Sequence, residues 1–301
     1  MSSSSPVPES CPICAADSPR TRYRLDGFRI LCCARCSQIY LRPLPSPEHI
    51  RETFTRLYTS GEGSVPELKT YYEYTYEDKP DNPLVQRYEI WLEAMERHRP
   101  PGRVLDIGCG TGLFLAVARR RGWEPFGIDE CEEATEHAQN HFGLDVWIGE
   151  FSDFRLHDRG FDAITGWDII EHARDPVGLM RSMRRCLAPG GVVALSTPNQ
   201  QSILDLIAGA LYRLSGGRLR APLEKFYIEQ HFLYFTPESL SHALGRAGFG
   251  VVELRRELTD LRRLTLSPFT RLALESLFAA ARVLGRENRI FSVARAEPAK
   301  R

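Results

Sequence analysis

Three glycines at alternate positions in the stretch LDIGCGTG (105–112) constrain the fold of this chain more than any other feature. They follow a strand-like segment, RVLDIG, and precede a helical one that begins near Leu113. Strand-like and helix-like segments then alternate as far as GVVALSTPN (191–199), which is typical of βαβ units around a parallel sheet. The glycine turn therefore lies at the carboxyl end of the first strand, where open α/β sheets bind their ligands.

The ligand expected at this turn contains a nucleoside. A dinucleotide turn has the pattern G-x-G-x-x-G, but the position of its third glycine is occupied here by Leu113, which argues against a nicotinamide enzyme. Asp129 ends the next predicted strand, 21 positions after Gly108. A carboxylate at that place can accept hydrogen bonds from both hydroxyls of a ribose.

Four segments in order resemble the successive motifs of class I S-adenosylmethionine-dependent methyltransferases: LDIGCGTG, GIDE, FDAITGWDIIEH and LAPGGVVALSTPN, within about residues 84–298. The resemblance implies an α/β, Rossmann-like fold with a seven-stranded, mostly parallel sheet whose last strand is antiparallel. It also implies S-adenosylmethionine as the cofactor.

The same resemblance assigns cofactor-binding residues. It implies that the glycines face the methionine and sugar parts, that Asp106 helps to hold the amino group, and that Asp129 holds the ribose. Phe151 would form an apolar wall beside the adenine and Glu150 would be its acceptor, although Asp153 is an alternative acceptor in that loop. The expected cofactor-binding set is Asp106, Gly108, Gly110, Gly112, Asp129, Glu150, Phe151 and Trp167.

Methyl transfer is an in-line displacement, so the enzyme must align donor and acceptor and remove a proton if the acceptor is a hydroxyl. His172, after the fourth predicted strand, is the first candidate base, with Glu171 or Asp168 to orient it. His231, after a long insertion, is the second and resembles a segment that crosses the active site in the family's small-molecule members. Alternatively, Glu171 and His172 only open the next helix, and His231 only holds its loop.

Two further segments are candidates for covering the site. Tyrosines at positions 71, 72, 74 and 76 would either fold over the cofactor or pack between domains. The insertion at about 200–235 mixes apolar and basic residues and is interpreted as a substrate lid. Residues 267–284 would cap an apolar acceptor or cover the edge of the sheet.

Four cysteines near the start have the spacing of a structural zinc site. Cys11 and Cys14, then Cys33 and Cys36, match C-x₂-C-x₁₅₋₂₀-C-x₂-C, and four thiolates would form a closed tetrahedral shell. Cys32 would replace Cys33 only in a shifted register, and a redox role for CPIC lacks its usual βαβ context. The block resembles the zinc-knuckle leader of a bacterial methyltransferase subgroup.

These features predict four parts: a disordered lead-in (1–10), a zinc-binding module (11–45), a helical linker or cap (46–100) and a methyltransferase domain (101–301). The 39 basic residues balance 39 acidic ones, so no overall field favours nucleic acid or a membrane surface. We expect a cytoplasmic enzyme that methylates an oxygen of a small molecule or glycan-type intermediate, without a membrane span and of unknown oligomeric state. The alternatives are an RNA- or protein-modifying enzyme docked by its zinc module and a non-catalytic binding protein.

Overall fold

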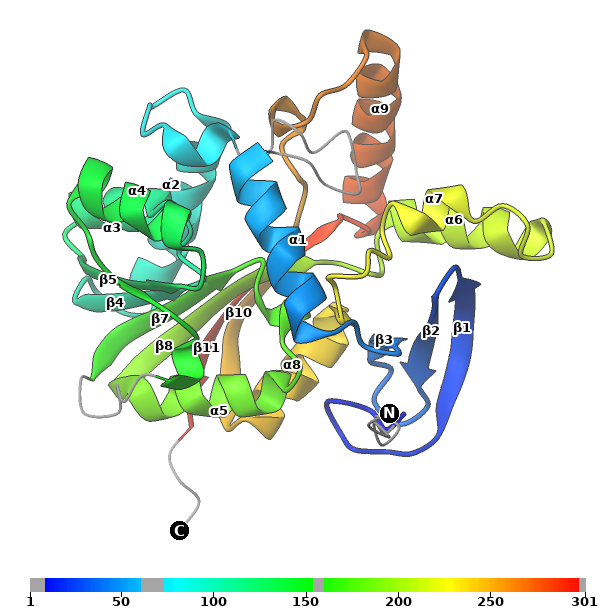
Figure 1. Ribbon diagram of the computed structural model, residues 1–301, viewed down its shortest axis with the longest axis horizontal. Coiled ribbons are helices and arrows are strands. Elements are labelled where there is room, and N and C mark those ends of the chain that lie inside the picture. Colours follow the sequence, from blue (N-terminus) through cyan, green and yellow to red (C-terminus); the bar gives the residue numbers. More distant parts are fainter. Residues whose placement is uncertain (1–8, 61–72, 154–159, 298–301) are drawn as a thin grey trace.

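The computed structural model describes residues 9–60, 73–153 and 160–297, and within them the strands form a large sheet and a small one (Figure 1). Neighbouring strands of the large sheet are parallel except for β11, which runs antiparallel to both of its neighbours. This topology confirms the expected Rossmann-like fold. In spatial order the strands are β10 (Phe249–Glu257), β11 (Arg289–Ala296), β8 (Leu187–Pro198), β7 (Phe161–Trp167), β4 (Arg103–Ile107), β5 (Glu124–Asp129) and β6 (Asp145–Ile148).

Helices cover both faces of the large sheet. Alternation along β4 sends Leu105 and Ile107 to one face and Val104 to the other, where separate apolar clusters form. The face of Leu105 packs against α5 (Pro176–Cys186) and α8 (Pro237–Arg246). The face of Val104 packs against α2 (Pro83–Glu96), α3 (Leu113–Arg120) and α4 (Glu132–Phe142).

Within the segment predicted as a helical linker or cap (46–100), α2 begins at Pro83. Asn82 is its N-cap, because the side chain of Asn82 accepts a hydrogen bond of 2.8 Å from the backbone N–H of Leu84. Pro83 follows as the first helical residue, where the missing N–H costs no hydrogen bond. At the start of α8, Thr236 is the N-cap, since its side chain accepts a hydrogen bond from the backbone N–H of Ser239.

The small sheet is built from two distant parts of the chain. Its strands are β1 (Pro19–Leu25), β2 (Phe28–Cys33), β3 (Ile39–Arg42) and β9 (Leu233–Tyr234). The first three come from the cysteine-rich block, whereas β9 ends the insertion and pairs antiparallel with β3. The insertion itself contains α6 (Ile203–Leu214) and α7 (Ala221–Glu224).

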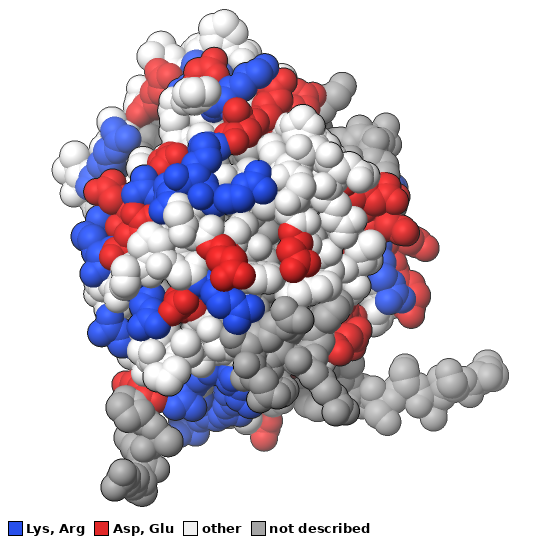
Figure 2. Space-filling view, turned by 90° about the vertical axis from the view of Figure 1, so that its left-hand side faces the viewer, with Lys and Arg blue, Asp and Glu red and all other residues white. Residues whose placement is uncertain are grey.

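The remaining elements are not part of either sheet and lie around the carboxyl ends of the parallel strands. They are α1 (Pro47–Ser60), α9 (Pro268–Leu284) and the 3₁₀ turns η2 (Glu73–Tyr76), η3 (Phe151–Asp153), η4 (Ile170–His172) and η5 (Leu261–Arg263). Over the described ranges, no helix has both the length and the apolar character needed to cross a bilayer. Figure 2 shows basic and acidic side chains interspersed over much of one face, in keeping with the zero net charge.

Candidate active site

A cavity of about 1360 Å³ opens at the carboxyl ends of β4, β5, β7 and β8. Ligand sites of open α/β sheets lie at this edge, and the volume exceeds that of a typical single-ligand pocket. Its wall includes every expected cofactor-binding and catalytic residue except Gly112. The lid segment also contributes to the wall, from Gln200 to Phe232.

The glycine turn needs its glycines for two different reasons. Gly108 has φ of 72° and Gly110 of 50°, a region that favours glycine, and both line the cavity. Gly112, with φ of 81°, is the N-cap of α3. A Cβ there would lie 2.8 Å from the Cβ of Ala138 in α4, so Gly112 permits close helix packing.

A buried carboxyl group, Asp106, and a half-buried one, Asp129, lie beside this turn without a basic partner among the described residues. Asp129 accepts hydrogen bonds from the backbone N–H groups of Gly110 (2.8 Å) and Cys131 (2.9 Å), and burial raises its pKa. Asp106 accepts from Thr165 Oγ1 at 2.6 Å, and burial raises its pKa to about 7. Buried carboxyls normally pair with cations, so this arrangement suits a positively charged ligand.

The cavity wall next to β6 and β7 is aromatic. Phe151 is buried at the start of η3 and lines the cavity together with Glu150. Asp153, the alternative acceptor, is not among the described lining residues. Trp167 stacks on Trp91 with ring centroids 4.5 Å apart, and its Nε1–H is buried without an acceptor in the part of the chain that the structure describes.

The three catalytic candidates meet in one corner of the cavity. Glu171, His172 and His231 each place one potential ligand or proton-transfer atom within 4.8 Å of the others. The rings of His172 and His231 lie edge to face, 4.8 Å apart. Their proximity follows from the lid segment, because the backbone N–H of Phe232 donates to the carbonyl of Glu171 at 2.8 Å.

The backbone of the insertion contacts the ring of His172. Its Nδ1 donates to the carbonyl oxygen of Gln230 at 2.7 Å, and the lone pair of the neutral ring is then on Nε2. Burial lowers the pKa of His172, so the ring is neutral at pH 7. Glu171 accepts from Thr197 Oγ1 at 2.8 Å, and burial, reinforced by Asp168, raises its pKa to about 8.

Sequence reasoning missed Arg289. Its guanidinium pairs with the carboxylate of Asp168, donates to Ser196 Oγ at 2.8 Å and lines the cavity. Asp168 has φ of 57°, a conformation that a non-glycine residue adopts only under constraint. Because β11 is antiparallel, it begins where its neighbours end. The predicted antiparallel orientation of the last strand therefore already indicated that its first residue, Arg289, lies at the ligand-binding edge of the sheet.

The tyrosine-rich stretch is described only in part, since positions 71 and 72 lie outside the described residues. Tyr74 donates through its hydroxyl to the carbonyl of Arg262 at 3.0 Å, and the Tyr76 ring packs edge to face against His137. Neither lines the cavity, but Thr75 does and accepts from Thr111 at 2.5 Å. The described tyrosines therefore serve packing.

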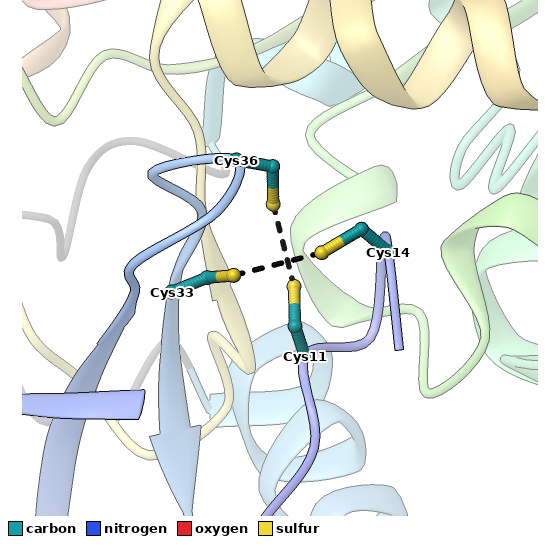
Figure 3. A group of neighbouring side chains, drawn as sticks. All are labelled: Cys11, Cys14, Cys33 and Cys36. Carbon is teal, nitrogen blue, oxygen red and sulfur yellow. Dashed lines mark hydrogen bonds between the residues drawn. The ribbon is translucent and has the colours of Figure 1, made fainter. Parts of the chain in front are cut away.

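The four predicted zinc ligands converge (Figure 3). The sulfur atoms of Cys11 and Cys36 are 3.5 Å apart and those of Cys14 and Cys33 are 3.6 Å apart, whereas Cys32 lies outside the group. Sulfur atoms in a tetrahedral shell with Zn–S bonds of about 2.3 Å lie roughly 3.8 Å apart. The donor set and its spacing therefore fit a zinc ion.

Comparison with known proteins agrees with this geometry. A family model described as a methyltransferase domain matches residues 84–254. A ubiquinone biosynthesis O-methyltransferase of Neisseria meningitidis is 36% identical over 122 residues, which are 37% of this chain and 51% of that protein. Its counterpart from Xanthomonas campestris is 33% identical over 131 residues, 41% of this chain and 55% of that protein. The chain thus spans about half the length of the curated relatives it matches.

Among solved structures, a SAM-dependent methyltransferase from Thermotoga maritima has the same fold. The TM-score is 0.51 at 19% sequence identity, with 83% of this chain and 99% of that one covered. The family model covers more than half of the chain, and the sheet order and glycine turn are those that the family resemblance implies. The chain belongs to the class I S-adenosylmethionine-dependent methyltransferase family.

Proposed function

We propose that this chain transfers a methyl group from S-adenosylmethionine to an oxygen atom of a small molecule. The observation that carries the proposal is the pair Asp106, which is buried, and Asp129, which is half-buried; neither has a basic partner in the described residues, and both lie beside the glycine turn. When bound, S-adenosylmethionine supplies a methyl group on a cationic sulfonium together with a second cation, its ammonium group. Oxygen as the acceptor is supported by the relatives named as O-methyltransferases.

The residues of the cavity would divide the task of binding. Asp129 would accept from the ribose hydroxyls and Asp106 would lie near the ammonium group. Phe151 would pack on the adenine, with Glu150 as a polar partner. Trp167 offers an N–H that has no acceptor in the described protein, so it can donate to a ligand. Gly112 supports the turn by packing rather than by contact.

His172 would remove the proton of the acceptor hydroxyl. Burial lowers the pKa of His172, so its imidazole is neutral and available as a base at neutral pH, and the carbonyl of Gln230 fixes its tautomer. Burial lowers the pKa of His231 well below its usual range, so this ring adds no charge next to His172. Glu171, protonated near neutrality, would hold Thr197 and the turn η4 in position.

We also infer that residues 11–45 bind one structural zinc ion. Two turns of the same form supply the ligands: the N–H of Ala15 donates to the carbonyl of Cys11, and the N–H of Ser37 donates to that of Cys33. Both Ala15 (φ 58°) and Ser37 (φ 60°) have the left-handed conformation that closes such a turn. The paired turns support a place in the zinc-knuckle subgroup.

Cofactor binding tests the first part of the proposal. Asp129→Ala should weaken S-adenosylmethionine binding at least about 100-fold in calorimetry, because hydrogen bonds to a charged group contribute about 1.5–3 kcal/mol each. Asp145→Ala is the matched control, since Asp145 is exposed at the start of β6. Equal affinities of the two variants would refute the assignment of Asp129.

Turnover tests the second part. In a labelled-methyl transfer assay against hydroxylated small molecules, His172→Ala should lose about 100-fold or more in kcat while it binds the cofactor like the unmodified protein. The preserved cofactor affinity shows that the variant is folded. His242→Ala, at an exposed position of α8, should keep full turnover. Full activity of His172→Ala would remove this residue from the reaction.

A further inference from the structure

The outer faces of α6 and α9 are apolar and exposed to solvent. Of the twelve exposed large hydrophobic side chains in the described chain, nine lie on these two helices or directly after α6. We call these nine residues the outer apolar surface. They are Leu206, Ile207, Leu211, Leu214, Leu219, Phe269, Leu272, Val283 and Leu284. Monomeric proteins rarely gather so many apolar side chains in one exposed region unless it binds something.

Inner packing does not explain this surface, because α9 has a second apolar face. Leu274 and Phe278 line the cavity on its inner side. At 100° per residue, Phe269 and Val283 lie on the opposite side of the helix, where they are 82% and 87% exposed. An ordinary amphipathic helix would carry polar residues there.

The two helices meet at one end. The backbone N–H of Ile203, at the start of α6, donates to the carbonyl of Arg286 directly after α9, at 2.9 Å. Leu206 and Ile207 lie one turn beyond this junction, and Leu284 lies two residues before it. Figure 1 shows α9 standing upright and α6 lying horizontally, both extending away from the large sheet.

Charge distinguishes between the partners that this surface could have. Residues 203–225 and 267–286 contain seven basic and three acidic residues, although the whole chain has zero net charge. One of the three acids, Asp205, is buried and paired with Arg22 at 2.8 Å, and one of the seven basic residues, Arg220, pairs with Asp26. A second copy of the chain would bring like charges together, whereas an anionic phospholipid surface would attract them.

We propose that the outer apolar surface docks this protein on an anionic membrane surface. The apolar side chains of α6 and α9 would enter the region between headgroups and acyl chains, and the flanking arginines would contact lipid phosphates. Leu204 and Phe278, on the inner sides of the same helices, line the cavity. The docked membrane would therefore lie against the helices that wall the cavity. The inference does not depend on methyl transfer.

Vesicle co-sedimentation of the full chain tests the proposal. We expect binding to vesicles of mixed phosphatidylglycerol and phosphatidylcholine, weaker by at least about tenfold on phosphatidylcholine alone and at high salt. Phe269→Gln combined with Val283→Gln should reduce binding to the anionic vesicles at least about tenfold. The matched control combines Ile90→Gln and Val252→Gln, which change exposed apolar side chains elsewhere, and should bind like the unmodified protein.

Two results would overturn the proposal. One is that the full chain does not bind anionic vesicles, or that the variant with Phe269→Gln and Val283→Gln in α9 binds them as well as the unmodified protein does. The other is a dimer in light scattering that the α9 variant dissociates while vesicles bind neither protein, which would assign the surface to a second copy. Calorimetry with S-adenosylmethionine on the same variants reports separately on the proposed activity, so the two proposals can fail independently.

Discussion

The proposed cofactor site depends on Asp106 and Asp129. They are close enough for the charge of Asp129 to add to the burial that raises the pKa of Asp106 to about 7. Protein interiors do not ordinarily keep two such groups together without a cation. The ligand-free site is thus electrostatically unfavourable, and a positively charged ligand would relieve this. The affinity of the site for such a ligand is therefore linked to the instability of the ligand-free protein.

This instability has a predicted pH dependence. The folded pKa of Asp106 lies above its unfolded value of 3.8, so the free energy of unfolding should fall as pH rises from about 4 to about 7. The loss should be on the order of 4 kcal/mol, since one pKa unit corresponds to about 1.4 kcal/mol. Asp106→Asn, whose side-chain oxygen can still accept from Thr165, should lack this loss in urea titrations of the ligand-free protein. Parallel pH curves for the two proteins would contradict the assignment.

Residues at strand ends were predictable, and residues fixed by long-range contacts were not. Asp129 and His172 follow predicted strands, and the rule for open α/β sheets places them at the binding edge. The contact from Gln230 to His172 is made by a backbone carbonyl, which carries no sequence signal. The binding of Glu171 to Thr197 likewise depends on how two loops meet.

At the scale of elements, Gly112 controls how α3 packs on α4. Gly112→Ala should cost about 3 kcal/mol of unfolding free energy. The new Cβ would collide with Ala138, and the alanine backbone would have to adopt a positive φ. Gly143→Ala is the matched control, since Gly143 also has a positive φ, of 59°, but open space around its Cα. It should cost about 1 kcal/mol in the same urea denaturation series. Equal losses would show that backbone conformation alone requires Gly112.

Local patterns predicted the βα elements, because each buries one face and so repeats its apolar residues with a fixed period. The strand β9 was not predictable. It has only two residues, Leu233 and Tyr234, which is too short for a repeat of apolar residues, and it pairs with the distant residues 39–40. The role of α9 was also open. Its sequence is apolar on two sides, and only the packed structure shows which side is buried.

At the scale of the whole molecule, the cysteine-rich block and the active site share one strand. β9 pairs with β3, and the carbonyl of Phe232 accepts from the N–H of Leu41 at 2.9 Å. Phe232 follows His231 directly and donates to Glu171. Asp205, within α6, adds a second link through Arg22. The four-cysteine cluster thus lies at one end of a series of backbone contacts that ends at the catalytic candidates.

Replacing one of the four clustered cysteines should therefore loosen residues 231–235, the segment that begins with the catalytic candidate His231. Cys36→Ser should lower the bound zinc below one ion per chain by mass spectrometry and speed amide exchange across residues 231–235 at least about tenfold. Cys32→Ser is the control, because the sulfur of Cys32 lies outside the cluster. It should retain zinc and normal exchange. Equal zinc binding by both variants would disprove the four-cysteine site. Loss of zinc with unchanged amide exchange would disprove the coupling, because the segment would then be held by the methyltransferase domain alone.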